Sequence, residues 1–580
     1  MANQTREKQL QDLKELKKPS VLIVGGGING IGLYRDLVLQ GVDVLLVERN
    51  DFCSGASAAL SRMIHGGLRY LEQGDFKLVR ESLEERNALL RNAPHYVFPL
   101  ATTIPIFDYS SGILNGLLQF LRLTDRPGKR GALVIKLGLS LYDFFTRTRR
   151  ETPIHRFHNK KETFRQWPDF HPEVKCSATY YDAWVTYPER LGLEMIMDAD
   201  QTNTGAAAIN YVSVANTKDG TVTLKDQITG EELPVQPTIV VNATGAWINL
   251  TNDALQGDDI NPVSKMVGGT KGSHLIIRND DLLKATGGQM VYYENQDGRI
   301  CILFPYFGNV LVGSTDIKID DPTDVRCEED ERDYILQSLA FVFPDITIKQ
   351  EEILYTFSGV RPLIHSDASV TGGISRDHVC RTLPETPGRP FPVLCMIGGK
   401  WTTFRAFGAQ VTDQILGTLN KSRQCSTFDV AIGGGKGFAK DKGAFDSWIN
   451  DLARNSGLGE TRLRTLAMRY GTATEDLIRF MQQGEDHLLA SDPSYSQREL
   501  LHIIEQEQVV TLEDILLRRT AMGISGNLSS DLVDEVLQIL AQARGWSTLQ
   551  IETARSEFLN RLASFHAVTF STPSRQCTNA

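Results

Sequence analysis

Three glycines and one acid near the N-terminus have the types and spacing of a site that binds a dinucleotide. Gly25, Gly27 and Gly30 form a G-x-G-x-x-G pattern, and Glu48 lies 18 residues beyond Gly30. The first glycine permits a tight turn, the second lets the backbone approach a pyrophosphate, and the third lets a helix pack closely on a strand. The helix N-terminus can hold the phosphates, and the acid can accept hydrogen bonds from ribose hydroxyls. An acid here disfavours a 2′-phosphate, so NAD and FAD remain the alternatives.

A second candidate turn lies more than 350 residues further along. Gly398 and Gly399 follow an apolar run at 393–397, and Lys400 and Thr402 follow the glycines. A reduced flavin carries negative charge, which a helix N-terminus and a lysine stabilise. These residues favour FAD over NAD, although an ordinary strand-to-helix turn with a surface lysine explains them equally well.

The hydrophobic pattern predicts the elements that position these residues. Apolar runs at 21–24 and 44–47 flank a helical period, which gives strand, glycine turn, helix and strand in about 30 residues. Aromatic and β-branched residues dominate 260–360 and predict a mostly antiparallel sheet. After a glycine linker at 433–435, the pattern is helical to about residue 565. Residues 1–19 are predicted to be a charged, helical and mobile leader.

Composition limits the class of protein. The chain has 580 residues, enough for two to four domains, with 41% hydrophobic and 23% charged residues. Its formal net charge of −10 argues against a nucleic-acid partner. Its eight cysteines are scattered with no close pair, which fits a reducing cytoplasm. No uncharged apolar run reaches 18 residues, so we expect no membrane-spanning segment, and we expect no metal site.

Further motifs resemble those of the FAD-dependent, quinone-linked (aerobic-type) glycerol-3-phosphate dehydrogenases over nearly the whole chain. The most distinctive is Ile-His-Gly-Gly-Leu-Arg-Tyr-Leu at 64–71. The others are Arg35-Asp36, Ser54-Gly55, Tyr181-Asp182-Ala183 with Arg190-Leu191, Asn-Ala-Thr-Gly-Ala-Trp at 242–247, Lys271-Gly272-Ser273-His274, Gly313-Ser314-Thr315-Asp316, Ser-Gly-Val-Arg-Pro-Leu at 358–363, Gly398-Gly399-Lys400 with Thr402-Thr403, Leu-Leu-Arg-Arg-Thr at 516–520 and Gly-Trp-Ser at 545–547. The chain departs from the family pattern at Arg62, where a lysine is expected, at Trp401 and Phe404, and at Gly32-Leu33-Tyr34.

The resemblance implies an α/β fold: a Rossmann-like FAD-binding domain of the glutathione-reductase or D-amino-acid-oxidase type, an antiparallel sheet that caps the substrate, and an all-α C-terminal domain. The ranges we expect are 1–19 for the leader, 20–100, 175–260 and 355–425 for the FAD-binding domain, 101–174 and 261–354 for the cap, and 436–570 for the helical domain.

The implied reaction is oxidation of sn-glycerol 3-phosphate to dihydroxyacetone phosphate, with electrons passed through FAD to a membrane quinone. An oxidase that uses oxygen carries the same motifs and is the alternative. A non-catalytic FAD-binding protein is a third reading, which the presence of all the expected substrate cations disfavours. A homodimer is also kept open.

Oxidising a secondary alcohol requires a base for the hydroxyl proton and cations for the phosphate dianion. Carried onto this sequence, the resemblance makes His274 the leading base and His65 its competitor. The other catalytic candidates are Arg361 and Tyr70. The expected substrate contacts are Arg69, Lys271, Thr315 and Lys400, and the expected cofactor contacts are Gly25, Gly27, Gly30, Glu48, Ser54, Ser57, Gly245, Gly398, Gly399 and Thr402. Without the resemblance, a lone histidine is more often structural.

Two short apolar segments, 112–121 and 132–142, have basic residues around them. Such helices suit the anionic interface of a bilayer, so the protein is expected in the cytoplasm, with peripheral binding to the inner face of the membrane as one reading. The alternative, weighed as slightly stronger, is that both segments are core helices of the cap.

Overall fold

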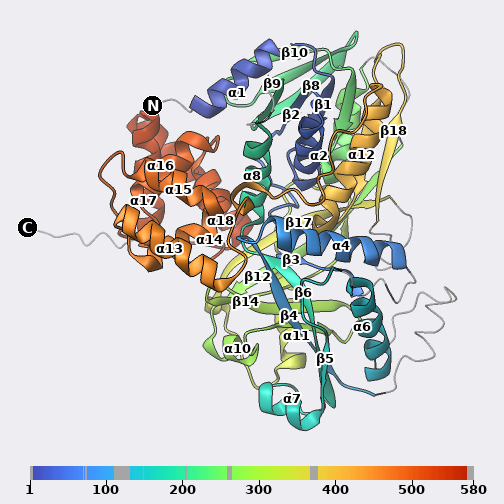
Figure 1. Ribbon diagram of the computed structural model, residues 1–580, viewed down its shortest axis with the longest axis vertical. Coiled ribbons are helices and arrows are strands. Elements are labelled where there is room, and N and C mark those ends of the chain that lie inside the picture. The colour runs from blue at the N-terminus through green and yellow to red at the C-terminus, as the bar shows by residue number, and fades with distance from the viewer. Residues whose placement is uncertain are drawn as a thin grey trace, which may run out of the picture.

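The computed structural model describes two large β-sheets, a smaller sheet of three strands, the helices that flank them and a helical C-terminal domain (Figure 1). The described residues are 4–68, 71, 75–109, 131–147, 149–200, 202, 205–257, 264–365 and 377–570. Of the expected site residues, Arg69 and Tyr70 lie outside these ranges, as does the apolar segment 112–121.

The smaller of the two main sheets has six strands and carries the glycine turns. Five strands are parallel, and only β18 is antiparallel to its neighbour. In spatial order the strands are β18 (His378–Leu383), β19 (Val393–Gly398), β11 (Ile239–Asn242), β1 (Val21–Val24), β2 (Val44–Val47) and β7 (Ala206–Ile209). Strand β1 lies between β2, the next strand along the chain, and β11, so the strand order changes direction at β1. A crevice is expected at such a point, at the carboxyl ends of β1 and β11.

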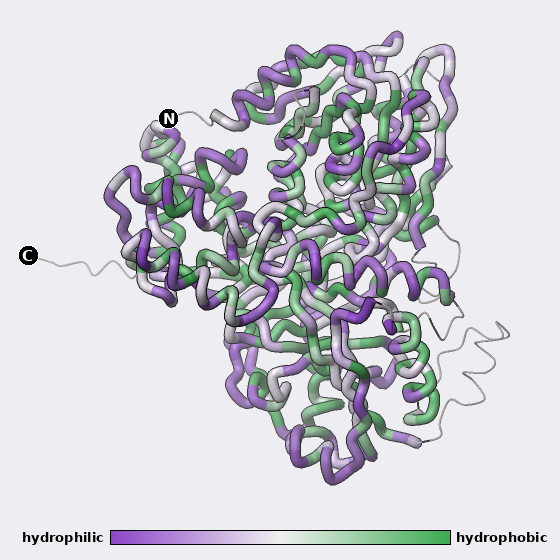
Figure 2. Tube along the Cα trace, in the orientation of Figure 1, coloured by the Kyte–Doolittle hydropathy of each residue, from purple (hydrophilic) through white to green (hydrophobic). Residues whose placement is uncertain are grey.

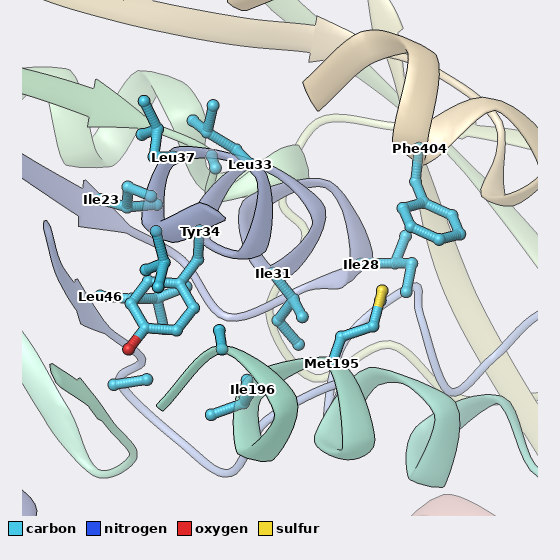
Figure 3. Packing of buried hydrophobic residues seen from close by; sticks show 14 of the residues in the cluster. Ile23, Ile28, Ile31, Leu33, Tyr34, Leu37, Leu46, Met195, Ile196 and Phe404 are labelled. Atoms are coloured by element: carbon cyan, nitrogen blue, oxygen red, sulfur yellow. The ribbon is translucent and has the colours of Figure 1, made fainter. Parts of the chain in front are cut away.

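Three helices cover one face of this sheet. Helix α2 (Ile28–Leu39) packs between α8 (Pro188–Asp200) and α12 (Phe404–Thr418). Ile23, Leu46 and their neighbours alternate along the strands, so every second side chain enters this core. Figure 3 shows Ile28 and Ile31 of α2 between Phe404 of α12 and Met195 of α8. The helix that follows the first glycine turn is therefore held on both sides.

The opposite face of the six-stranded sheet packs on a three-stranded antiparallel sheet. This sheet consists of β8 (Val212–Lys218), β9 (Thr221–Asp226) and β10 (Glu232–Val235). Helix α1 (Gln4–Glu15) lies along the edge strand β7, where Gln9 accepts a hydrogen bond from Ala208 N–H at 3.1 Å. The predicted leader is thus helical, but it is packed against the fold rather than mobile, and it covers an exposed sheet edge.

The larger sheet has ten strands and is mostly antiparallel; the β4–β13 pair is parallel. Its path is β16 (Ile317–Ile319), β12 (Val267–Ile277), β15 (Asn309–Gly313), β14 (Ile300–Tyr306), β13 (Met290–Glu294), β4 (Val97–Ile106), β6 (Cys176–Val185) and β3 (Met63–Ile64), with β17 (Ile353–Ile364) paired to β12 and β5 (Arg156–His158) paired to β6. Strands β3, β6 and β17 come wholly or partly from the ranges 20–100, 175–260 and 355–425, so these three ranges contribute to both sheets.

Helices flank the larger sheet and fill the C-terminal part of the chain. Those near the larger sheet and its connections are α4 (Phe76–Asn92), α6 (Ala132–Thr146), α7 (Lys160–Gln166), α10 (Asp280–Ala285) and α11 (Glu329–Val342), whereas α9 (Ile248–Leu255) packs on β8 and β11. The C-terminal domain contains α13 (Lys442–Ser456), α14 (Glu460–Tyr470), α15 (Thr474–Met481), α16 (Gln497–Gln506), the π-helical turn η7 (Asp514–Arg519), α17 (Ser530–Arg544) and α18 (Thr548–His566). The expected fold class, with its antiparallel sheet and all-α C-terminal domain, is confirmed.

Candidate active site

A cavity of about 2300 Å³ lies where the two sheets and the C-terminal domain meet. Residues at the carboxyl ends of β1, β11 and β19 line one side of it, among them Gly25, Gly245 and Gly398. Strands β12, β15 and β17 of the larger sheet line the other side, with His274, Gly313 and Arg361. The cavity therefore lies at the position where open α/β sheets bind their ligands.

The first glycine turn has no room for side chains. Gly25 has a φ of +112°, and a Cβ built on it would lie 2.7 Å from the backbone of Ala243. A Cβ on Gly30 would lie 2.0 Å from the carbonyl oxygen of Gly25. Gly27 caps α2 without a side-chain hydrogen bond, and Ser57 Oγ accepts the N–H of Ile28 at 2.9 Å. The first turn of α2 thus presents backbone N–H groups to the cavity, as phosphate binding requires.

Glu48, at the end of β2, braces this turn. Its carboxylate accepts hydrogen bonds from the N–H groups of Gly26 at 2.7 Å and Asn50 at 2.9 Å. Burial raises the pKa of Glu48 above its ordinary value, and these two hydrogen bonds oppose the rise. The carboxylate also lines the cavity, where its remaining lone pairs can accept from ribose hydroxyls.

The turn after β19 contacts the first turn on the same side of the cavity. Gly398 and Gly399 have φ values of +74° and +90°, and Asn29 donates to the carbonyl of Gly398 at 3.3 Å. Thr402 hydroxyl donates to the carbonyl of His65 at 3.4 Å, and Lys400 Nζ donates to Ser82 at 2.8 Å. All of the expected cofactor contacts line the cavity except Gly30, which lies behind the turn, within helix α2.

His274, on β12, is the buried base candidate of the cavity. Its ring is 2% exposed, stacks on Phe357 at 4.9 Å between centroids and has no hydrogen-bond partner on either nitrogen. Burial, reinforced by the charges of Arg361 and Arg62, lowers the pKa of His274 to about 3. The imidazole is therefore neutral near pH 7 and has a lone pair available for a ligand's hydroxyl.

Arg361 lies beside His274 because two glycines make room for both side chains. A Cβ on Gly272 would lie 2.2 Å from the guanidinium of Arg361, and one on Gly313 would lie 2.2 Å from the ring of His274. The guanidinium donates to Asp316 at 3.1 Å, the carbonyl of Thr315 at 3.2 Å and Ser314 Oγ at 3.1 Å. It is 28% exposed at the cavity wall, where it can bind an anion.

The structure does not bring Lys271 to the cavity. Residues 271 and 274 differ by an odd number on one strand, so their side chains point to opposite faces. Lys271 Nζ instead forms an ion pair with Glu331 at 2.6 Å. Thr315 lines the cavity, but its hydroxyl donates to Glu331 at 2.7 Å and accepts from Ser273 N–H at 2.9 Å. Both residues act within a polar network behind the wall.

Arg62 and Asp182 are two cavity residues to which the sequence assigned no role. Arg62 has a φ of +59°, is buried and forms an ion pair with Glu189 at 2.8 Å. Its departure from the expected lysine was the available signal. Asp182 is a buried carboxylate in the motif Tyr181-Asp182-Ala183. An acidic residue within a mostly apolar strand was the sequence signal that could have indicated a site.

Sequence comparison gives two family matches. Residues 20–398 match the family described as FAD dependent oxidoreductase, and residues 425–551 match the C-terminal domain of alpha-glycerophosphate oxidase. A glycerol-3-phosphate dehydrogenase from Synechocystis is 32% identical over 92% of this chain and 94% of its own length. An aerobic glycerol-3-phosphate dehydrogenase from Staphylococcus aureus strain USA300 is 30% identical over 93% of each chain.

Solved structures share the fold. The glycerol-3-phosphate dehydrogenase from Bacillus halodurans complexed with FAD matches with a TM-score of 0.74 and 23% identity, over 97% of this chain and 98% of that one. L-alpha-glycerophosphate oxidase from Mycoplasma pneumoniae with FAD bound matches with a TM-score of 0.51 and 18% identity, over 72% of this chain and 99% of that one.

Proposed function

Because the chain belongs to the FAD-dependent glycerol-3-phosphate dehydrogenase and oxidase family, its cofactor is FAD, and we propose that it oxidises sn-glycerol 3-phosphate to dihydroxyacetone phosphate and passes the electrons to a membrane quinone. The observation that carries the proposal is the pairing of a neutral, unpartnered histidine with an arginine on one cavity wall. A secondary alcohol that carries a phosphate needs one base and at least one cation, and His274 and Arg361 supply these two groups.

The residues opposite this wall fit FAD. The N-terminus of α2 and its glycine turn would hold the pyrophosphate, and Glu48 would accept from the adenosine ribose. The Gly398–Thr402 turn, at the N-terminus of the helical segment that continues into α12, would face the negative charge of a reduced flavin. When bound, FAD supplies the acceptor for the hydride that leaves C2 of the substrate.

The protein's own residues account for the other half of the oxidation. We assign the hydroxyl proton, released as the C2 carbonyl forms, to a ring nitrogen of His274, because His274 lines the cavity and neither ring nitrogen has a hydrogen-bond partner among the described residues. The phosphate dianion of a bound substrate would offset the arginine charges that lower the pKa of this histidine. Arg361 binds the phosphate or the developing negative oxygen with a fixed fork of donors. Ser314 and Asp316 hold that fork in place. We retain His65 as the second candidate base and Lys400 as a substrate cation, because both line the cavity.

Anaerobic titration with glycerol 3-phosphate tests the reaction. Substrate should bleach the flavin absorption without any added acceptor, and a panel of related phosphorylated polyols defines the substrate class. A flavin that stays oxidised with every phosphate in the panel contradicts the proposal and leaves a non-catalytic FAD protein. Turnover in air then separates the acceptors: a quinone analogue should be reduced with little peroxide, whereas stoichiometric peroxide favours the oxidase.

Transfer of electrons to a membrane quinone requires a surface of the protein that binds the membrane, and helix α6 has a suitable surface. No helix among the described residues is long and apolar enough to cross a bilayer. One face of α6 is buried, as the core-helix reading expects, but Leu133, Leu137 and Phe144 on its other face are 55–65% exposed. Figure 2 shows the strong hydrophobic colour of this helix. Four exposed basic residues accompany this face: Lys136, Arg147, Arg149 and Arg150.

Apolar side chains flanked by basic ones suit an anionic lipid surface. Wild-type protein should float with vesicles that contain anionic lipid at low salt, and Leu137→Ser should weaken flotation while leaving flavin reduction unchanged. Leu549→Ser is the matched control, because Leu549 is equally exposed but lies on α18. Flotation that is absent at low salt contradicts membrane docking without touching the oxidation itself. Light scattering on the same preparation tests whether the protein forms the homodimer that the sequence leaves open.

A further inference from the structure

The proposed reaction gives no role to Asp182, a buried carboxylate on the cavity wall. Asp182 lies on β6, is 1% exposed and lines the cavity. Its Oδ1 accepts hydrogen bonds from the N–H of Gly66 at 3.0 Å, from Arg86 at 3.2 Å and from the hydroxyl of Tyr142. A carboxylate buried to this degree requires such partners. Arg86, itself 1% exposed, supplies the compensating charge.

Tyr142 is the second member of this cluster, and it comes from helix α6. Its hydroxyl accepts the N–H of Gly66 at 3.0 Å and a hydrogen bond from Arg86 at 3.3 Å, while it donates to Asp182. Burial raises the pKa of Tyr142 well above its ordinary value, so the phenol keeps its proton at neutral pH. Its ring lies edge-on to Tyr180 at 5.8 Å between centroids, which fixes its orientation.

Both oxygens converge on one backbone N–H, that of Gly66. Gly66 lies between His65 and Gly67, and these two residues and Leu68 line the cavity. A Cβ on Gly66 would lie 2.4 Å from the Tyr142 hydroxyl, so the backbone is in close contact with the cluster. On the other side, the carbonyl of His65 accepts from Thr402 at 3.4 Å. The turn is thus held between α6 and the glycine turn after β19.

We propose that Tyr142 and Asp182 are positioning residues that fix the Gly66 amide and thereby hold the His65–Leu68 wall of the cavity against the substrate. They touch the backbone of this wall and act through it. Helix α6 also exposes Leu133 and Leu137 on its other face. This helix therefore connects the surface proposed to meet the membrane with the cavity wall, through the hydrogen bond of Tyr142 with Gly66. The catalytic part of this inference rests on the proposed oxidation.

Tyr142→Phe tests the inference because it removes one hydroxyl and keeps the ring. The rate of flavin reduction by glycerol 3-phosphate should fall at least tenfold or the apparent substrate dissociation constant should rise by that factor, while FAD content stays at the wild-type level. The matched control is Tyr293→Phe, which removes a similarly buried hydroxyl that contacts Ser338 at 2.8 Å and comes from strand β13 of the ten-stranded sheet. The control should stay within twofold of wild type.

Hydrogen exchange of the peptide that contains Gly66 gives a readout that needs no substrate. Its amide should exchange at least tenfold faster in Tyr142→Phe than in Tyr293→Phe. Unchanged exchange, or a rate and dissociation constant within twofold of wild type, overturns the inference. Asp182→Asn, which keeps the side-chain shape, should give a larger effect in the same direction. If wild-type flavin is not reduced by glycerol 3-phosphate, the proposed function fails, but the exchange experiment still decides whether the cluster holds the turn.

Discussion

Burial and the charges of Arg361 and Arg62 together lower the pKa of His274 and so decide its protonation state. Arg361 and Arg62 each add to the effect of burial, so His274 would have to gain a charge next to charges of the same sign. This arrangement keeps the imidazole neutral at neutral pH, so His274 is not a cation for the phosphate. The positive charge that a phosphate requires is left to Arg361, which can keep its charge at any relevant pH.

The buried histidine should make the protein less stable in acid. The folded-state pKa of His274 is about 3, below the 6.5 of an exposed histidine, so between these values the unfolded chain binds the extra proton. The free energy of unfolding should therefore fall as the pH falls through this window, by up to roughly 1.4 kcal/mol per pH unit from this residue. Thermal unfolding of His274→Asn should depend less on pH between 6.5 and 4 than that of wild type.

The matched control for this experiment is His487→Asn, whose ring is 59% exposed. It should keep the wild-type slope. An unchanged slope in His274→Asn would show that the histidine is not held neutral by burial. His566, with its pKa lowered to about 4 mainly by burial, should contribute with the same sign and can be replaced as a second case.

Replacing Arg361 should separate substrate binding from cofactor binding. Arg361→Gln keeps a polar group but loses the charge, and a charge-assisted pair is worth about 1.5–3 kcal/mol, so kcat/KM for glycerol 3-phosphate should fall roughly 100-fold. The purified protein should stay yellow, because the glycine turns to which we assign the cofactor are on the opposite wall. Arg381→Gln, on the exposed edge strand β18, is the control. Full activity of Arg361→Gln excludes the assigned role.

At the scale of residues, the sequence indicated which residue types the site needs, but it was less informative about where their side chains point. The glycine turns could be predicted because each glycine answers a local steric requirement. Lys271 and His274 were grouped because they are close in sequence, but strand parity separates them, and the strand assignment alone would have shown this. The partner of Lys271, Glu331, lies 60 residues further along the chain, beyond what a local pattern can indicate.

At the scale of elements, the chain passes back and forth between the six-stranded and the ten-stranded sheet. The parallel strands near the glycine turns were predictable, because continuous apolar runs are typical of strands buried on both faces. The pairing of β3 with β6 was not, because β3 has two residues and its register depends on Met63 and Ile64 meeting a strand more than a hundred residues away. Which residues belong to which of the two sheets is therefore decided by strand pairing between distant parts of the chain.

The glycines between the FAD-binding and helical domains form a tight joint rather than a loose linker. Gly434 and Gly435 are buried, and a Cβ on Gly434 would lie 2.0 Å from the carbonyl oxygen of Tyr470 on α14. Gly434→Ala should therefore lower the free energy of unfolding by about 1–3 kcal/mol. Calorimetry should show the loss in the transition of the helical domain.

Gly417→Ala is the control for this joint. Gly417 lies in helix α12 with open space around it, and an alanine there should be neutral or stabilising by up to about 1 kcal/mol. Equal unfolding temperatures for Gly434→Ala and Gly417→Ala would mean that the joint has room to relax.

At the scale of the whole molecule, the helical domain contacts a loop beside the cavity to which we assign FAD. Its η7 turn sends Arg518 and Arg519 into the loop after β2, where both contact Asp51 at 2.6 Å. The two guanidinium groups hold the pKa of Asp51 below its ordinary value. Asp51 directly precedes the segment with Ser54 and Ser57, which lines the cavity. The η7 turn, whose Ile515 and Leu516 share a hydrophobic core with the ten-stranded sheet, thus fixes a loop that follows a strand of the six-stranded sheet.

Arg519→Gln should therefore release FAD as well as destabilise the protein. Breaking a buried ion pair from one side costs about 3–5 kcal/mol, because Asp51 is left buried with one cation fewer. The loop that Asp51 anchors should loosen, so the temperature at which flavin fluorescence appears should fall together with the unfolding temperature. Arg555→Gln removes an arginine of the same domain whose partner, Asp534, is partly exposed, and such a pair is worth about 0–1 kcal/mol. If both variants release FAD at the same temperature, the helical domain does not hold the cofactor loop. If only Arg519→Gln releases it early, the C-terminal domain is part of the cofactor site.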